Sequence, residues 1–297
     1  MIRRTFLKTA SLLGAGTLVS ANSCSMEETP KFKMGYQLFS VHDDMVKDTL
    51  DTLRALKEMG YEDFEIYGFD DQAVSYYGIP ATDFRAMLDD LNLTVTSGHY
   101  GFSPILMASD DERKRFVDQC ISGARVLGAP YITWPWLDPE YRNIESYKIL
   151  VDRLNLIGEQ ITAAGLGFAY HNHGFEFEDH NGENGYDLIM RGTESDLVKL
   201  QIDMYWVMHS ARRTPKELIA EQPGRFVMWH IKDMDKITRD YTELGNGSID
   251  YVEILPDPEL AGLEYYYLEQ GGNFTHNALR SAADSAAFFQ ANLQRFL

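Results

Sequence analysis

The sequence predicts an α/β fold of the (β/α)8 class, a single TIM barrel domain that follows an N-terminal export signal. Short β-rich runs alternate with amphipathic helical patterns from Lys33 to the C-terminus. Eight such units fill about 265 residues, which is the size and number typical of this barrel. The alternative is an open doubly wound sheet, which usually has a glycine-rich phosphate loop after its first strand. Here Ser40-Val41-His42-Asp43-Asp44 stands at that place, so the barrel is favoured.

The eight predicted strands are short runs rich in β-branched and aromatic residues. Their starts lie roughly 27 to 38 residues apart, the repeat length of a strand followed by a helix. No linker divides the series, which indicates one domain. The runs are Met34–Phe39, Asp63–Tyr67, Leu93–His99, Tyr131–Trp134, Leu166–His171, Lys199–Asp203, Phe226–Ile231 and Leu263–Glu269.

Helical patterns lie between these runs. The best of them place apolar residues on one stripe, and three end at a glycine of the kind that follows a helix C-terminus. A fourth begins at Thr214-Pro215, where proline stands at a position whose N–H has no helical partner. The first three patterns are Asp43–Met59 before Gly60, Asp110–Leu127 before Gly128, and Ile144–Ala164 before Gly165.

The N-terminal residues predict an export signal. Arg3-Arg4 and the four residues after them resemble the twin-arginine motif, and an apolar run follows from Ala10 to Ala21. Ala21-Asn22-Ser23-Cys24 is similar to a lipoprotein cleavage box, so we expect a lipid anchor at Cys24. We therefore predict a signal over 1–24, a tether over 25–32 and the catalytic barrel over 33–297, in a periplasmic or membrane-anchored lipoprotein.

Composition narrows the classes of partner. The formal net charge of −18 repels phosphodiester backbones, so we expect no nucleic-acid partner. After the signal, no apolar run approaches the roughly 20 residues of a membrane span. We therefore expect the protein to contact the membrane only through a lipid anchor at Cys24. The other cysteine, Cys120, then has no partner for a disulfide, and its helical pattern predicts a small buried residue.

Four consecutive predicted strands end in residues that can bind a metal. Glu176, Asp203, His230 and Glu269 lie at or just after strands five to eight. Because active-site residues of barrels come from these ends, one cation could contact all four side chains. Three carboxylates and one imidazole suit Mn²⁺ best, with Mg²⁺ or Co²⁺ as alternatives. Glu178 is the alternative to Glu176 as the ligand that follows strand five.

Four segments carry a resemblance to the xylose-isomerase-like barrel superfamily, which holds sugar epimerases, inosose dehydratase and endonuclease IV. The resemblance extends from about Met34 to the C-terminus. In the D-tagatose 3-epimerase type, the metal is held by a Glu, an Asp, a His and a Glu, and the two glutamates act as bases on opposite faces of the sugar. The resemblance therefore implies that Glu176 and Glu269 are catalytic as well as metal ligands. The segments are Tyr170–His173 with Phe175–Phe177, Gln201–Asp203, Trp229–Asp233 and Tyr267–Gln270.

Six further residues are expected to contact the substrate. Imidazoles can bind hydroxyl groups or relay protons, a lysine can hold an oxyanion, and tryptophans can pack on the apolar face of a sugar. Two features depart from the epimerase pattern: histidines flank an asparagine on strand five, and a tryptophan stands soon after Asp203. The six residues are His99, Trp136, His171, His173, Trp206 and Lys232.

These residues predict a metal-dependent isomerase or epimerase that acts on a free keto-sugar or related polyol through an enediolate. A lyase is the first alternative: the same enediolate would expel a β-hydroxyl, or the reverse reaction would add water, with His171 or His173 as the acid. A non-enzymatic sugar-binding lipoprotein is the second. Export and the absence of a phosphate loop favour a free or glycosidic sugar over a sugar phosphate.

Overall fold

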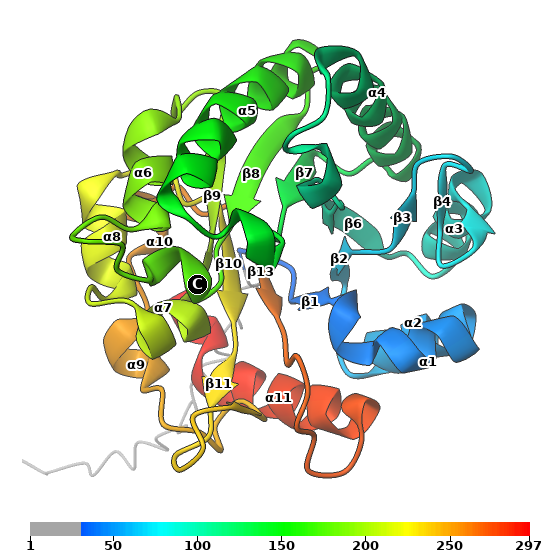
Figure 1. Cartoon of the computed structure of the whole chain (residues 1–297). Helices are drawn as coiled ribbons and strands as arrows, with labels where there is room; N and C mark the ends of the chain where they lie inside the picture. Colours follow the sequence, from blue (N-terminus) through cyan, green and yellow to red (C-terminus); the bar gives the residue numbers. More distant parts are fainter. Residues whose placement is uncertain (1–30) are drawn as a thin grey trace, which may run out of the picture.

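Eight parallel strands close into a barrel in the computed structural model, which describes residues 31–297 (Figure 1). Around the barrel the strands follow the order β1, β13, β10, β9, β8, β7, β6, β2, and helices surround them. The predicted (β/α)8 fold is confirmed. The predicted export signal and nearly all of the predicted tether lie outside the described residues.

The barrel strands coincide with the eight predicted runs, and several lose one or two residues at their ends. The missing residues lie where the chain leaves the parallel ladder of hydrogen bonds. The ends of each strand are therefore set by pairing with its neighbours and not by composition. The strands are β1 Gly35–Gln37, β2 Asp63–Ile66, β6 Thr94–His99, β7 Tyr131–Trp134, β8 Gly167–His171, β9 Lys199–Asp203, β10 Met228–Ile231 and β13 Tyr265–Leu268.

The prediction of one helix over Asp43–Met59 is wrong, because two helices occupy this segment. Helix α1 spans His42–Lys47 and α2 spans Thr49–Glu58. Asp48 between them has an extended backbone (φ −156°, ψ 93°), and its side chain accepts a hydrogen bond from the backbone N–H of Asp51. Aspartate is a strong N-cap residue, so it begins a new helix here although the apolar stripe continues.

The other predicted helices form with the expected ends. Helix α4 spans Asp110–Leu127, α5 spans Ile144–Ala163, and α8 spans Pro215–Glu221 after the N-cap Thr214. Gly128 ends α4 in a left-handed conformation, with φ of 72°. The remaining helices are α3 Ala81–Asp90, α6 Gly185–Gly192, α7 Met204–Ser210, α9 Tyr251–Ile254, α10 Pro258–Ala261 and α11 Ala278–Asn292. Among the described residues, no helix combines the length and apolar character that crossing a membrane requires.

Two small antiparallel sheets, which the sequence did not reveal, follow barrel strands. After β2 the chain forms β3 (Phe69–Asp70), β4 (Ser75–Tyr76) and β5 (Ile79–Pro80) before α3 begins. After β10 it forms β11 (Asp233–Met234), which pairs with β12 (Tyr241–Thr242). Strands of two residues are too short to give a visible alternation in sequence. Both sheets belong to loops on the side of the barrel where the active site is expected.

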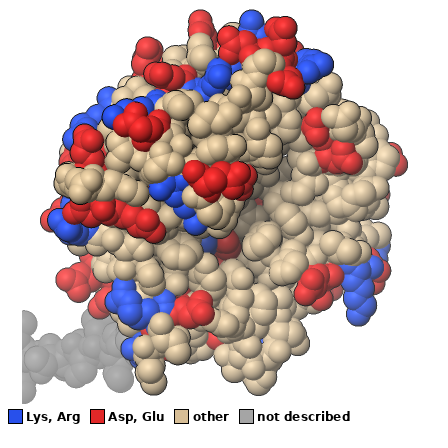
Figure 2. Space-filling model, in the orientation of Figure 1, with Lys and Arg blue, Asp and Glu red and all other residues tan. Residues whose placement is uncertain are grey.

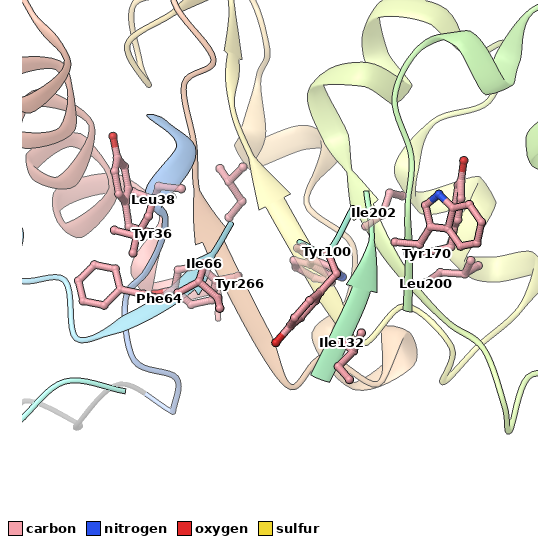
Figure 3. Packing of buried hydrophobic residues seen from close by; sticks show 14 of the residues in the cluster. Tyr36, Leu38, Phe64, Ile66, Tyr100, Ile132, Tyr170, Leu200, Ile202 and Tyr266 are labelled. Atoms are coloured by element: carbon pink, nitrogen blue, oxygen red, sulfur yellow. The ribbon is translucent and has the colours of Figure 1, made fainter. Parts of the chain in front are cut away.

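The main hydrophobic core lies between the barrel and its helices. Alternate strand residues, such as Phe64 and Ile66 of β2 or Leu200 and Ile202 of β9, belong to this core (Figure 3). A separate small cluster includes Ala169, Met228 and Tyr267, the strand residues of the opposite alternation. Further along these same strand faces, the buried residues become polar. This change from apolar to polar side chains inside the barrel places the candidate site.

Candidate active site

A pocket of about 1130 Å³ opens at the C-terminal ends of the barrel strands. Figure 2 shows a hollow near the middle of the face that Figure 1 presents. Among the residues that line the pocket are all six predicted substrate contacts, His99, Trp136, His171, His173, Trp206 and Lys232, and the predicted metal ligand Glu269.

Three of the four predicted metal ligands lie together. Asp203, His230 and Glu269 each present one ligand atom, and these atoms lie within 4.8 Å of one another. Asp203 and His230 are direct partners in the parallel ladder of β9 and β10, and Glu269 follows β13, the next strand. Glu269 also contacts Nδ1 of His230 with its Oε2. The parallel register thus converts residues far apart in sequence into one compact group.

Lys232 lies between the two carboxylates of this group. Its Nζ is 2.7 Å from Oδ2 of Asp203 and 2.8 Å from Oε2 of Glu269. Burial alone would lower the pKa of this lysine, but the two carboxylates raise it above its ordinary value. Conversely, burial alone would raise the pKa of Glu269, and the charges of Lys232 and His230 instead hold it well below the usual range. Lys232 and Glu269 are therefore both charged at neutral pH.

Glu65 organises the floor of the site from β2, and the sequence analysis gave it no role. This fully buried carboxylate accepts hydrogen bonds from Ser97 Oγ (2.7 Å) and Gln201 Nε2 (2.6 Å) at Oε1. At Oε2 it accepts one from Gln37 Nε2 (2.6 Å) and meets Nε2 of His230 (2.6 Å) and of His99 (2.9 Å). Burial alone would raise its pKa, but the charges and hydrogen bonds of the two histidines lower it well below the ordinary value.

The position of His230 follows from this arrangement. One ring nitrogen faces Glu65 and the other faces Glu269, so both edges of the imidazole are fixed. Burial alone would lower the pKa of His230, but the two carboxylates raise it to about 9. A carboxylate that holds the far nitrogen of a histidine is the usual partner of a metal-binding imidazole. Glu65 stands in that place. The position of Glu65 on a predicted barrel strand was the sequence feature that could have pointed to this role.

Glu176 does not join the group. It lies in a 3-10 helix, Phe175–Phe177, beyond the end of β8, and it is fully buried. Its two oxygens accept hydrogen bonds from the Tyr170 hydroxyl (2.8 Å) and from the backbone N–H of His173 (2.8 Å). Burial raises its pKa to about 8, although these hydrogen bonds oppose the rise. Glu176 is not among the residues that line the pocket, whereas the exposed Glu178 is.

Imidazoles occupy the pocket wall beside this group. The rings of His99, His171 and His230 lie 4.5 to 5.4 Å apart between centroids, and each offers a nitrogen within 4.8 Å of the others. Nε2 of His171 is 3.8 Å from Oδ2 of Asp203. Burial, together with nearby positive charges, lowers the pKa of His171 and of His173 well below the ordinary value. Both rings are therefore neutral at pH 7 and can accept or donate a hydrogen bond.

Aromatic rings form the upper part of the pocket. Trp136 follows β7, is 42% exposed, and meets His173 at 5.1 Å between ring centroids. Trp206, on α7, meets His173 at 5.7 Å. Phe39 and Phe69 contribute to the lining as well. Such rings can pack on the apolar faces of sugars while polar groups at the floor bind hydroxyls.

The donor set at the floor fits one divalent cation. Oδ2 of Asp203 is buried and has no hydrogen-bond partner within residues 31–297, although Lys232 lies beside it as an ion-pair partner. Asp203 and Glu269 face Lys232, whereas Glu65 faces His230. One lysine does not balance these three carboxylates, and a divalent ion with a neutral His230 would complete the charge balance. Carboxylates with an imidazole are ligands that such ions accept in proteins. The described residues Asp203, His230 and Glu269 could therefore hold a metal.

Solved structures with the same fold cover almost the whole chain. A sugar phosphate isomerase/epimerase from Parabacteroides distasonis ATCC 8503 is 25% identical, with a TM-score of 0.77 over 93% of this chain and 99% of that chain. The IolI protein, solved with a bound zinc atom, is 14% identical, with a TM-score of 0.68 over 90% and 99%. A probable 3-DHS dehydratase from Bacillus anthracis is 16% identical, with a TM-score of 0.65 over 87% and 99%. Among curated protein sequences, none matches the chain significantly.

The sequence profile of one family matches the greater part of the barrel. It covers residues 53–257, from α2 to the segment before α10, and so includes Glu65, Asp203 and His230. The matched span and the closed parallel barrel agree with each other. The chain belongs to the xylose isomerase-like TIM barrel family.

Proposed function

We propose that this protein is an enzyme that removes a proton next to the carbonyl group of a keto-sugar and returns it as an isomerase or epimerase. The observation that carries the proposal is the group of Asp203, His230 and Glu269 at the floor of a pocket lined by imidazoles and aromatic rings. A non-enzymatic sugar-binding protein would not need two buried carboxylates held beside a lysine and a histidine, because buried charges are costly unless they serve a purpose.

Each residue at the floor has a part in the proposed reaction. Glu269 is ionised and lines the pocket, so it is the base that takes the proton. A divalent cation, when bound, supplies positive charge that stabilises the enediolate formed by that step. Lys232 stays protonated and donates to an oxyanion of the substrate. His230 is held by Glu65, and His99 binds a hydroxyl group.

The return of the proton determines the product. Delivery to the same carbon from the opposite face gives an epimer, and delivery to the adjacent carbon gives an isomer. The family resemblance assigns the opposite face to Glu176, whose raised pKa suits an acid near neutral pH. In the arrangement described here Glu176 is enclosed by Tyr170 and the backbone of His173, so its direct contact with substrate would require this loop to open.

A second candidate function is a lyase or hydratase, and the imidazoles favour it. His171 and His173 line the pocket where a two-glutamate epimerase needs its second carboxylate. In this reaction Glu269 removes the proton beside the carbonyl, the C–H electrons form a carbon–carbon double bond, and the β-hydroxyl leaves. His173, whose ring is neutral, orients the leaving hydroxyl through a hydrogen bond, and the proton that Glu269 has taken passes to that hydroxyl, so water departs and an enone remains. The reverse sequence adds water to the enone.

The pocket supports a glycosidic substrate over a free monosaccharide. Its volume of about 1130 Å³ exceeds the roughly 300–1,000 Å³ typical of pockets for drug-sized ligands. A single sugar ring at the floor would leave the aromatic upper part unused. We therefore propose that the keto-sugar carries a further ring, which packs against Trp136. The expected export signal agrees with an unphosphorylated substrate outside the cytoplasm.

The experiment is an exchange assay in deuterated water. The purified protein is loaded with Mn²⁺ or Co²⁺ and incubated with a panel of keto-sugars and keto-glycosides. Deuterium incorporation without loss of mass to water indicates epimerisation or isomerisation, and loss of water with a new enone absorbance indicates the lyase. In both cases Glu269→Gln should abolish exchange, because an amide cannot take the proton.

A matched control separates chemistry from charge. Glu159→Gln removes one carboxylate from the exposed side of α5 and should exchange at the wild-type rate. The proposal fails if Glu269→Gln exchanges as fast as the wild type, or if chelation of the metal leaves turnover unchanged.

A further inference from the structure

The group of Asp203, His230 and Glu269 comes from three neighbouring strands of the barrel. The next strand carries a histidine at its end, where a glutamate was expected to complete the group. Asp203 ends β9, His230 lies in β10 and Glu269 follows β13. The next strand along the barrel is β8, which pairs with β9. Its last residue is His171, a direct ladder partner of Gln201. The position from which β8 can reach the group is therefore occupied by an imidazole.

Distances place His171 within reach of the group. Its Nε2 is 3.8 Å from Oδ2 of Asp203, and two ligand atoms that each lie roughly 2.0–2.2 Å from one ion can be at most about 4.4 Å apart. Its ring centroid is 4.5 Å from that of His230. His230 belongs both to the group with Asp203 and Glu269 and to the group with His99 and His171. The two groups thus meet at one residue.

The chemistry of His171 also fits a ligand. The side chain is 1% exposed, and Nε2, the ring nitrogen that faces Asp203, lies beyond hydrogen-bond distance of Oδ2 of that residue. A metal ion binds the unprotonated nitrogen of an imidazole, and Nε2 of His171 faces the group. A buried polar side chain without a strong partner is otherwise costly.

Glu176 is already engaged elsewhere. Both of its oxygens accept hydrogen bonds, from the Tyr170 hydroxyl and from the backbone of His173, and Tyr170 belongs to the core outside the barrel. To reach Asp203 it would have to give up both bonds while it stays buried, and a buried polar group that loses its hydrogen-bond partners is costly.

We propose that His171 is the fourth protein ligand of the metal, in the place that the family resemblance gives to Glu176. The proposal rests on the metal of the proposed function. It changes the donor set from three carboxylates and one imidazole to two of each. Imidazoles favour Zn²⁺ and Co²⁺ over Mg²⁺, so the preferred ion moves in that direction from the Mn²⁺ expected from sequence.

The test measures metal binding directly. Affinities for Mn²⁺, Co²⁺ and Zn²⁺ are determined by competition with a chromophoric chelator for the wild type and for His171→Ala, Glu176→Gln and His276→Ala. His276 is exposed and serves as the matched histidine control. Loss of a residue that only orients a ligand typically weakens binding 10–100-fold, so His171→Ala should weaken it by at least about that factor. Glu176→Gln and His276→Ala should bind within about threefold of the wild type.

Two further measurements do not depend on the alanine variant folding. Pulsed EPR of the Mn²⁺-loaded wild type should detect nitrogen couplings from two imidazoles, and those of one ring would overturn the assignment. His171→Glu restores a third carboxylate and should bind Mn²⁺ or Mg²⁺ at least as well as the wild type while losing preference for Zn²⁺. If Glu176→Gln loses the metal and His171→Ala keeps it, the inference is wrong and the proposed function stands. If the wild type binds none of these ions, both fail.

Discussion

Replacing Glu65 by glutamine tests whether the barrel floor depends on a buried charge. The carboxylate meets five side-chain donors, two at Oε1 and three at Oε2. An amide has only one acceptor oxygen, so either orientation leaves at least two of these donors facing an NH2 group. With the NH2 at Oε1, Ser97 can turn to accept a hydrogen bond, but Gln201 remains unpaired, and His230 loses its charged partner.

The magnitude follows from these contacts. One unpaired buried donor costs about 1–3 kcal/mol, and removing one partner of a buried ion pair costs about 3–5 kcal/mol. Because the two effects share one network, they do not add fully. We expect Glu65→Gln to lower the free energy of unfolding by about 3–5 kcal/mol. We also expect it to weaken metal binding by about 10–100-fold, since His230 would no longer be oriented.

The assay is urea denaturation at neutral pH, followed by circular dichroism and tryptophan fluorescence, with metal affinity measured on the folded fraction. Glu159→Gln on the exposed side of α5 is the control and should change stability by less than about 0.5 kcal/mol. A Glu65→Gln protein as stable as this control, with unchanged metal affinity, would refute the reasoning.

Three other predictions concern parts of the molecule with different roles. Burial alone would raise the pKa of Glu243, but hydrogen bonds from Ser281 and the Thr275 backbone lower it from 4.5 to about 2. The ionised side chain therefore stabilises the fold above pH 4.5, and this stabilisation is lost as the pH falls toward 2. The stability difference between wild type and Glu243→Gln should therefore shrink by about 3 kcal/mol over this window in denaturant titrations, and a constant difference would contradict it. Gly35→Ala should lower thermal stability severely or prevent folding, because its Cβ would lie 2.1 Å from a backbone oxygen, whereas Gly101→Ala meets nothing within 4 Å and should fold normally. Trp136→Ala should raise KM for a keto-glycoside by about 2–10-fold and leave that of a free keto-sugar nearly unchanged, since an aromatic contact contributes about 0.5–1.5 kcal/mol; equal effects on both would argue against the glycoside.

The barrel could be predicted from sequence because its signals are local and repeated. Each run that enters the barrel is short, apolar and followed by a helical stripe, as at Tyr131–Trp134 and α5. The split between α1 and α2 escaped prediction because Asp48 acts through a single side-chain cap within a continuous apolar stripe. The small sheet β3–β4–β5 escaped because its pairing involves only two residues a strand.

The site could be predicted in part for a related reason. Asp203, His230 and Glu269 are polar residues at predicted strand ends, and parallel register brings such ends together. Glu65 was visible on a predicted strand, but its importance lies in five partners that come from four other strands. For Glu176, the sequence shows a carboxylate after a strand and cannot show that Tyr170 and a backbone N–H already hold it.

The sheet of β3, β4 and β5 forms part of the pocket wall without belonging to the barrel. It carries Phe69, which lines the pocket, and its three strands pair with one another. One buried bond joins it to the barrel, between the hydroxyl groups of Tyr76 in β4 and Tyr100 after β6. The eight barrel strands form a separate sheet, so their pairing does not depend on the length of the β3–β5 segment. An insertion or deletion in the loops of this sheet would therefore reshape the entrance of the pocket while the residues at its floor keep their places, which is where changes of specificity are tolerated best.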